Sequence, residues 1–328
     1  MTACVTGANG FIGSHLVDRL LSEGYAVRAL VRRSSNLRWL EGKGVELVYG
    51  DVRDVASLPA FVAGADLIFH IAAVVKARTR DEYFEANERA TRHLLEAAHA
   101  HAPSLRRFLY VSSQTAAGPA PSLDAPLTED SPCHPITSYG ESKIAAENVV
   151  KEWSGRLPWT IVRPPAVFGP RDTEIFIYFQ TVARGLNSII GLGDKRLNLI
   201  YSEDLVDGFL RAATADIAVG QTYFLASEDY YSWPQIGGIV GRALNKKFVT
   251  LRVPHAVVYL VAMVAQSIAA LRRQAATLNL EKARDITREY WICDSSKARR
   301  ELGFREKYSI DEAIMRTVEW YRQQGWLR

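Results

Sequence analysis

The stretch Thr6-Gly7-Ala8-Asn9-Gly10-Phe11-Ile12-Gly13, close to the start of the chain, decides the fold. It follows the short apolar run Ala3–Thr6. It precedes a helical pattern in which Ile12, Leu16 and Leu20 recur four residues apart. Between a strand and a helix, such glycines permit a tight turn, close approach of the backbone to a pyrophosphate, and close helix–strand packing. The helix N-terminus then offers free N–H groups and a positive dipole end to phosphates. We therefore predict a dinucleotide-binding loop; the alternative is a glycine turn without a ligand.

Short apolar runs alternate with longer helical patterns over the first two-thirds of the chain. The runs are nearly continuous in apolar residues, as expected for strands that helices cover on both faces. They are Ala3–Thr6, Ala26–Val31, Val45–Tyr49, Asp66–Ile71, Arg107–Ser112 and Trp159–Val162. This alternation predicts an α/β fold with a Rossmann-type, doubly wound parallel sheet.

The pattern changes near Pro164, where prolines interrupt regular structure. Later segments predict a helix over Glu174–Arg184, a helix from Ser202, a last strand at Thr222–Leu225, and a mainly helical remainder. We therefore expect residues 1–165 to form the nucleotide-binding domain, with 200–228 returning to it. Residues 166–199 and 229–328 are expected to form a smaller, mainly helical substrate-binding domain.

Composition narrows the functional classes. The chain has 328 residues, of which 48% are apolar and 23% charged, which is typical of a globular protein. A net charge of +4 is too small to indicate nucleic acid as the main partner. The three cysteines, Cys4, Cys133 and Cys293, lack the spacing of a zinc site and indicate reduced thiols. With no signal peptide before the glycine motif, we expect a cytoplasmic enzyme without a metal.

Two arginines, Arg32 and Arg33, end the second predicted strand. An NAD-selective site usually has an acidic residue at this place to hold the ribose 2′-hydroxyl. Guanidinium groups instead suit a 2′-phosphate, so we expect NADP, with NAD possible. The alternative is that both arginines are solvated surface side chains.

Tyr139 and Lys143 stand four residues apart, which places them on one face of a helix. Ser138 and Glu141 are predicted to form a capping box that starts this helix. An ammonium group near the phenol favours phenolate and is expected to lower the pKa of Tyr139, making it a proton donor or acceptor. The alternative is a chance pair, since this spacing is common.

A pair of serines, Ser112 and Ser113, follows the strand that begins at Arg107. The carboxyl ends of parallel strands face the ligand crevice, where a serine hydroxyl can bond a substrate oxygen. The alternative is that these serines only turn or cap the chain.

Several motifs now occur in an order that resembles a known family. They are Thr6-Gly7-x-x-Gly10-Phe11-Ile12-Gly13, Gly50-Asp51-Val52, His70-Ile71-Ala72-Ala73, Asn87, Ser112-Ser113, Tyr139-x-x-x-Lys143, Arg163-Pro164-x-x-Val167-Phe168-Gly169-Pro170 and Glu203-Asp204-Leu205. Together they resemble the extended short-chain dehydrogenase/reductases, also called the NAD-dependent epimerase/dehydratase family.

This resemblance implies roles for particular residues. Tyr139 would be the general acid/base, Lys143 would hold the nicotinamide ribose, and Ser113 would orient the reacting oxygen. Ser113 is preferred to Ser112 because the family's hydroxyl residue stands five before a glycine, here Gly118. Asn87 would be the catalytic helix asparagine, although a polar core asparagine fits equally well. The implied cofactor-binding residues are Gly7, Asn9, Gly10, Phe11, Ile12, Gly13, Arg32, Asp51, Val52, Ala72, Ala73, Tyr139, Lys143 and Pro164, with Asp51 at the adenine.

Three departures separate the branches of the family. Gln114 and Thr115 stand where dehydratases carry an Asp-Glu pair, and neither can do that proton chemistry. Ala166 replaces an asparagine that contacts the diphosphate of nucleotide sugars. Arg32 and the Ser112-to-Pro119 stretch resemble 3β-hydroxysteroid dehydrogenases and dihydroflavonol reductases. We therefore expect an NAD(P)-dependent oxidoreductase of an apolar carbonyl or hydroxyl compound. A nucleotide-sugar 4-epimerase with tightly bound NAD, or a non-catalytic cofactor-binding sensor, are the alternatives.

The segment Pro254–Leu271 is almost entirely apolar, and its larger apolar residues form one helical stripe. We expect a helix buried on that side as a wall of the substrate pocket. An interfacial helix that contacts a membrane peripherally is the second possibility, which similar segments in the sterol-dehydrogenase branch favour. A membrane span is the third. Pairing of 81–102 and 139–153 with a second copy is the dimer interface that the family resemblance implies.

Overall fold

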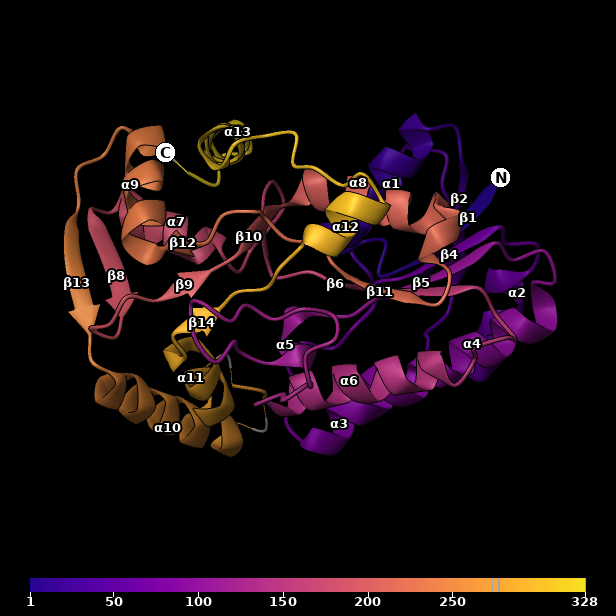
Figure 1. Ribbon diagram of the computed structural model, residues 1–328, viewed down its shortest axis with the longest axis horizontal. Helices are drawn as coiled ribbons and strands as arrows, with labels where there is room; N and C mark the ends of the chain where they lie inside the picture. The colour runs from indigo at the N-terminus through magenta and orange to yellow at the C-terminus, as the bar shows by residue number, and fades with distance from the viewer. Residues whose placement is uncertain (273, 277, 328) are drawn as a thin grey trace.

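A seven-stranded parallel sheet forms the centre of the computed structural model, which describes residues 1–272, 274–276 and 278–327 (Figure 1). Its spatial order is β11-β6-β5-β4-β1-β2-β3, and every neighbouring pair is parallel. The strands are β1 (Thr2–Thr6), β2 (Ala26–Val31), β3 (Glu46–Tyr49), β4 (Leu67–His70), β5 (Arg107–Val111), β6 (Trp159–Arg163) and β11 (Gln221–Phe224). The order reverses between β1 and β4, and ligands bind at such a switch point in open α/β sheets. The predicted Rossmann-type sheet is confirmed.

Helices cover both faces of this sheet (Figure 1). One apolar core lies between the sheet and α1 (Phe11–Ser22), α8 (Ser202–Thr214) and α12 (Ser296–Glu301). The other lies between the sheet and α2 (Leu58–Val62), α4 (Ala90–His101) and α6 (Ser138–Lys151). Because both faces are buried, the strands are apolar throughout, as the sequence indicated.

Shorter helical pieces complete this half of the molecule. Helix α3 (Arg80–Phe84) continues through a π-helical turn, Glu85–Arg89, into α4. Helix α5 (Gln114–Ala117) follows β5, and single 3-10 turns cover Val55–Ser57 and Asp216–Ala218. The segment 81–102, which the family resemblance places in a dimer interface, is therefore three consecutive helical pieces rather than one regular helix.

The later segments contribute helices and three small sheets. The helices are α7 (Phe176–Ala183), α9 (Trp233–Leu244), α10 (His255–Leu271), α11 (Leu280–Thr287) and α13 (Ile310–Gln323). The small sheets pair β7 (Ala166–Phe168) with β10 (Leu199–Tyr201), β8 (Leu186–Ile190) with β13 (Val249–Val253), and β9 (Arg196–Leu197) with β12 (Tyr231–Ser232) and β14 (Tyr290–Trp291). Helices predominate there, as predicted, whereas these strands were not predicted because most of them are short. The proposed domain division, 1–165 with 200–228 against 166–199 with 229–328, stays a prediction.

Helix α10 differs from the expected wall of a pocket. Its buried residues are Val258 and Ala262 alone, whereas the larger apolar side chains of the predicted stripe are exposed. They are Val257, Leu260, Val261, Val264, Ile268 and Leu271, between 45% and 86% exposed. The stripe therefore marks the outer face of the helix, and the small opposite face packs on the chain. Among the described residues, no helix is long and apolar enough to cross a membrane.

Candidate active site

The turn between β1 and α1 has the geometry of a phosphate-binding loop. Gly7 adopts a positive φ of 70°, and a side chain there would lie 2.9 Å from the Ala72 nitrogen. A Cβ on Gly13 would lie 2.0 Å from the Gly7 carbonyl oxygen, so only glycine lets α1 approach this turn. Helix α1 begins after Gly10 with no side-chain cap and no acidic residue in its first turn. The residues present therefore fit a dinucleotide, because the first N–H groups of α1 are available for phosphates.

A buried polar chain that sequence reasoning did not assign joins β1 to β4. The Thr6 hydroxyl accepts hydrogen bonds from the backbone of Ile71 and Ala72, both at 3.1 Å, and bonds His70 Nδ1 at 2.8 Å. His70 Nε2 lies 3.0 Å from the Thr91 hydroxyl on α4. Burial lowers the pKa of His70 to about 3, so the ring is neutral. This chain fixes the loop that carries Ala72 and Ala73 beside the glycine turn.

Charged groups gather where β2 and β3 end, which is the expected adenosine side. Asp51 accepts two side-chain hydrogen bonds from Arg53, at 2.9 and 2.7 Å. These bonds lower the pKa of Asp51, and the nearby charge of Arg32 adds to the effect. Arg32 itself is exposed, and Val52 follows Asp51 at the same edge. Asn9 reaches this region by donating to the Asn36 carbonyl at 3.5 Å.

Ser113 and Tyr139 meet at the end of β5. Ser113 caps α5, and its hydroxyl lies close enough to the Tyr139 phenol to influence the pKa of that phenol. The Thr115 hydroxyl donates to Ser113 Oγ at 2.9 Å, which leaves the Ser113 proton for another oxygen. A Cβ on Gly140 would lie 2.4 Å from the Thr115 carbonyl oxygen, so glycine lets α6 come close enough for this contact. Thr115 had no positive role in the sequence analysis and is a positioning residue here.

Lys143 occupies the same face of α6 as Tyr139 but does not have the predicted effect on it. Its Nζ is buried, donates to the Val111 carbonyl at 2.7 Å and lies 4.4 Å from the Tyr110 ring centre. Burial lowers the pKa of Lys143 to about 7, and the Glu147 carboxylate opposes this fall. Burial also raises the pKa of Tyr139, which the Ser113 hydrogen bond only partly offsets. The expected lowering by Lys143 is therefore wrong for this structure, because desolvation of the phenol dominates.

The Ser112 hydroxyl takes part in a buried hydrogen-bond network with Glu147 and Arg163. Its hydroxyl donates to Glu147 Oε1 at 2.6 Å. Arg163 binds both oxygens of the same carboxylate, at 2.9 and 2.7 Å, with both side chains at most 2% exposed. The Ser112 hydroxyl is therefore engaged by Glu147, and the choice of Ser113 for the reacting oxygen stays a prediction. Pro164, which directly follows β6, accepts a hydrogen bond from the Gln114 backbone at 2.8 Å and so joins this edge to α5.

Asn87 lies in the π-helical turn and braces two neighbours. Its side chain exchanges hydrogen bonds with the backbone of Val74, at 2.8 and 3.0 Å, and donates to the Ser142 hydroxyl at 2.9 Å. Ser142 in turn donates to the Tyr139 carbonyl at 2.7 Å. These contacts position the loop after β4 against α6, and a catalytic role for Asn87 stays a prediction.

The start of α6 is capped differently from the predicted box of Ser138 and Glu141. Thr137 is the N-cap and accepts from the Gly140 backbone at 3.1 Å. Glu281 on α11 accepts from both the backbone and the hydroxyl of Ser138, at 3.1 and 2.6 Å. The predicted capping box is therefore wrong. A carboxylate 143 residues away in the chain holds the residue next to Tyr139, and no local sequence signal could have found it.

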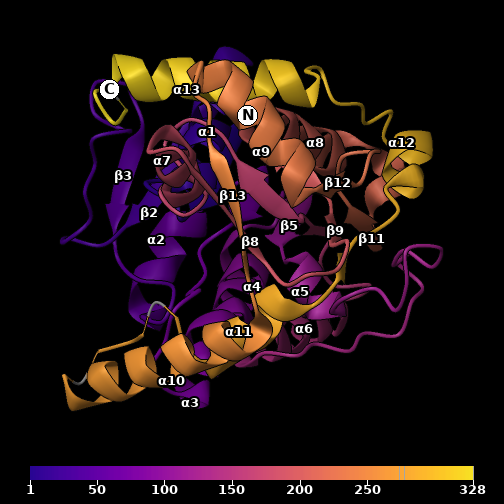
Figure 2. The same cartoon turned by 90° about the vertical axis from the view of Figure 1, so that its left-hand side faces the viewer.

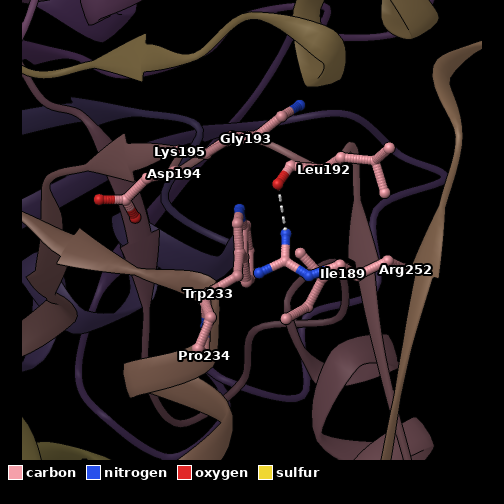
Figure 3. A pocket seen from close by; sticks show the side chains of 8 residues that line it. All are labelled: Ile189, Leu192, Gly193, Asp194, Lys195, Trp233, Pro234 and Arg252. Carbon is pink, nitrogen blue, oxygen red and sulfur yellow. Dashed lines mark hydrogen bonds between the residues drawn. The ribbon is translucent and has the colours of Figure 1, made fainter.

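A separate cavity of about 230 Å³ lies in the later segments (Figure 3). It is lined by Ile189, Leu192, Gly193, Asp194, Lys195, Trp233, Pro234 and Arg252. Arg252 points into it and donates to the Leu192 carbonyl at 2.9 Å. Because it contains none of the predicted catalytic or cofactor residues, we assign it no part in the reaction.

The predicted site residues converge on one edge of the sheet. The glycine turn, Arg32, Asp51 with Val52, Ala72 with Ala73, Ser113 and Pro164 follow the carboxyl ends of β1 to β6. Tyr139 and Lys143 reach this edge from α6. Within the described part of the chain, no three His, Cys, Asp or Glu residues are placed to hold a metal ion. The arrangement can hold a dinucleotide and present a hydroxyl pair to a substrate oxygen.

Comparisons with known proteins agree with this arrangement. The chain is 30% identical to the ceramide reductase of Caulobacter vibrioides over 98% of its length and 95% of that protein. It is 31% identical to sterol demethylase protein B of Methylococcus capsulatus over 99% of both chains. A UDP-glucose 4-epimerase from Thermotoga maritima, solved with UDP-glucose, shares the fold with a TM-score of 0.81 and 22% identity over 99% of both chains. The model of the NAD dependent epimerase/dehydratase family matches residues 3–226, and the chain is an NAD(P)-dependent enzyme of this family, of the extended short-chain dehydrogenase/reductase type.

Proposed function

We propose that this enzyme transfers a hydride between NADP(H) and a carbonyl or hydroxyl carbon of an apolar, lipid-like compound. The placement of Ser113 at the end of β5, beside Tyr139 on α6, carries the proposal, because it presents two hydroxyl groups to one substrate oxygen. When bound, the nicotinamide supplies or accepts the hydride. In the reducing direction the carbonyl π electrons move to oxygen, and that oxygen takes the Tyr139 proton. Ser113 holds the same oxygen by a hydrogen bond.

The elevated pKa of Tyr139 suits this role. A phenol that stays protonated at neutral pH can give a proton to a developing alkoxide. Lys143 lies on the same face of α6, where its ammonium can contact the nicotinamide ribose, as the family resemblance implies. Its present bond to the Val111 carbonyl holds Nζ at the carboxyl end of β5.

Two observations favour reduction of an apolar carbonyl compound over the alternatives. Gln114 and Thr115 follow Ser113, so the acid–base pair that a dehydratase needs is missing. Two relatives that match over nearly their whole length are named as a ceramide reductase and a sterol demethylase protein. These names support a lipid-like substrate here as a proposal. The epimerase is a fold neighbour at 22% identity and supports the fold alone.

The preference for NADP rests on the end of β2. Arg32 is exposed there beside Asp51, and Arg33 lies over the Tyr49 ring, 5.4 Å from its centre. A guanidinium at this place can pair with a 2′-phosphate, and β2 ends without an acidic residue to hold a 2′-hydroxyl.

Two further expectations are kept as proposals. Helices α4 and α6 lie on one face of the sheet and are bridged by Arg92 and Glu152 at 2.9 Å, which offers a two-helix surface to a second copy. The three cysteines are free, and burial raises the pKa of Cys4 to about 12, which suits a reducing, cytoplasmic location.

The test is NADPH oxidation with a panel of hydrophobic ketones, run beside NADH. We expect turnover with NADPH, and Arg32→Ala should weaken NADPH binding about tenfold while leaving NADH binding unchanged. Arg106→Ala, at another exposed arginine distant from the site, is the matched control. Tightly held NAD that survives purification, with epimerisation of a nucleotide sugar, would instead establish the epimerase. Cofactor binding without turnover of any substrate would establish the sensor.

A further inference from the structure

Helix α10 presents an apolar face that no other part of the described chain covers. Leu260 and Val264 are 57% and 53% exposed, and Leu271 at the end of the helix is 86% exposed. Surface helices of globular proteins normally turn charged residues outward, but α10 has none between His255 and Leu271. A contiguous exposed apolar surface of this kind marks a contact site for a partner.

The position of α10 suits contact with an extended surface. It lies at the outer edge of the molecule, away from the central sheet, and α11 packs against its inner side (Figures 1 and 2). Val258 and Ala262 make the inward contact, with Ala283 of α11. Among the described residues, none buries the larger apolar side chains on the outer face of this helix.

The charge of the segment around α10 indicates which kind of partner its apolar face would contact. Residues 252–288 contain six Lys and Arg residues and two Asp and Glu residues, a net charge of +4. The rest of the chain contains 34 of each sign, but Arg252 points into the separate cavity and the exposed Glu289 directly follows this segment, so the excess of positive charge around α10 is smaller than +4. Both acidic residues are engaged, Glu281 by Ser138 and Asp285 by Lys282 at 2.7 Å. Arg272, directly after Leu271, and Arg288, at the end of α11, are exposed cations, whereas Arg284 donates to the Ile136 carbonyl at 3.5 Å.

We infer that the α10 face, Val257 to Leu271, docks the enzyme on an anionic lipid membrane without crossing it. Apolar side chains enter the boundary between headgroups and acyl chains, and the flanking cations attract the anionic headgroups. A second copy placed on this face would bring two positively charged segments together, which Coulomb repulsion opposes. The charge pattern therefore favours lipid over self-association.

This docking would also orient the active site. Helix α11 connects the docking helix to the catalytic helix, because Glu281 holds Ser138, the residue before Tyr139. The N-terminal end of α6 thus lies on the side of the molecule that carries α10 (Figure 1). An enzyme docked in this way would have its reacting hydroxyl pair near the lipid surface. Docking itself does not depend on the proposed reaction and is measured separately from it.

The experiment is co-sedimentation of the full chain with vesicles of phosphatidylcholine alone or with phosphatidylserine added. We expect binding to the anionic vesicles, weaker binding to neutral ones, and release at high salt. Leu260→Asp should reduce binding about tenfold to a hundredfold. It removes a leucine that the bilayer would bury on docking, and it adds a negative charge that the anionic headgroups repel. Arg272→Gln and Arg288→Gln should each reduce binding to anionic vesicles about fivefold.

Met315→Asp on α13 is the matched control, because Met315 and Leu260 are both helical and both 57% exposed. This variant should bind as the unmodified chain does. Failure of the unmodified chain to sediment with either vesicle overturns the inference. So does equal weakening by Met315→Asp, or a dimer in light scattering that Leu260→Asp converts to a monomer, since a second copy would then cover α10.

Discussion

Helices α6 and α10 are similar in length and opposite in their relation to the rest of the chain. Helix α6 buries two of its charged residues, Lys143 and Glu147, and hydrogen bonds attach it to β5, β6 and the π-helical turn before α4. Helix α10 buries two small or medium apolar residues and exposes its large ones. The first helix is fixed where chemistry needs fixed atoms, whereas the second keeps apolar surface for a partner outside the chain.

The largest difference should appear when the reacting group on α6 is removed. Tyr139→Phe keeps the ring in place and removes the proposed proton-donating hydroxyl beside Ser113, so turnover should fall about 10²- to 10⁴-fold. Cofactor affinity should be unchanged, because the glycine turn and Lys143 remain. The measurement is kcat with a reducible ketone beside a cofactor titration.

Tyr83→Phe is the control for this variant. The Tyr83 ring lies 6.2 Å from the Tyr139 ring, so the site keeps its aromatic neighbour when only the Tyr83 hydroxyl is lost. We expect most of the activity to remain. Equal turnover of Tyr139→Phe and the unmodified enzyme would remove Tyr139 from the mechanism.

The next largest effect is expected on the free energy of unfolding, when the buried Glu147 carboxylate is replaced. Glu147→Gln leaves the buried Arg163 guanidinium without its anion, and unpaired buried charges are costly. We expect the free energy of unfolding to fall by about 3 kcal/mol in urea titrations. Glu152→Gln, at the exposed end of the same helix, breaks the surface pair with Arg92 and should cost less than about 1 kcal/mol.

Glu147→Gln should also change the pH dependence of the free energy of unfolding, which a loss of packing alone would not do. Glu147 opposes the fall in the pKa of Lys143, so its loss should lower that pKa below about 7. The unfolded chain holds the Lys143 proton up to a pH near 10, so stability rises with pH from the folded-state pKa to that value. In Glu147→Gln this rise should begin at lower pH than in the unmodified protein. An unchanged onset would show that Glu147 has no electrostatic influence on Lys143.

Local patterns predicted the fold and the placement of the candidate site residues at one edge of the sheet, because the relevant constraints are local. A glycine turn needs its three glycines within one strand–helix junction, and Tyr139 and Lys143 share a helix face by their spacing alone. The capping of Ser138 by Glu281 was missed because it joins residues 143 positions apart. Desolvation of Tyr139 and Lys143 also depends on packing around them, which spacing does not specify. The stripe on α10 predicted an amphipathic helix, but periodicity cannot tell whether the chain or a partner covers the apolar side.

The smallest expected effect tests whether the chain itself or a partner covers the apolar side of α10. Leu260→Ala should change the free energy of unfolding by less than about 0.5 kcal/mol, because the side chain is already exposed in the isolated molecule. Leu94→Ala on α4 makes the same chemical change at a fully buried position and should cost about 2 to 5 kcal/mol. Urea titrations of both variants without lipid provide the measurement. A large loss for Leu260→Ala would mean that something covers α10 in solution, and concentration dependence of that loss would identify a second copy as the cover.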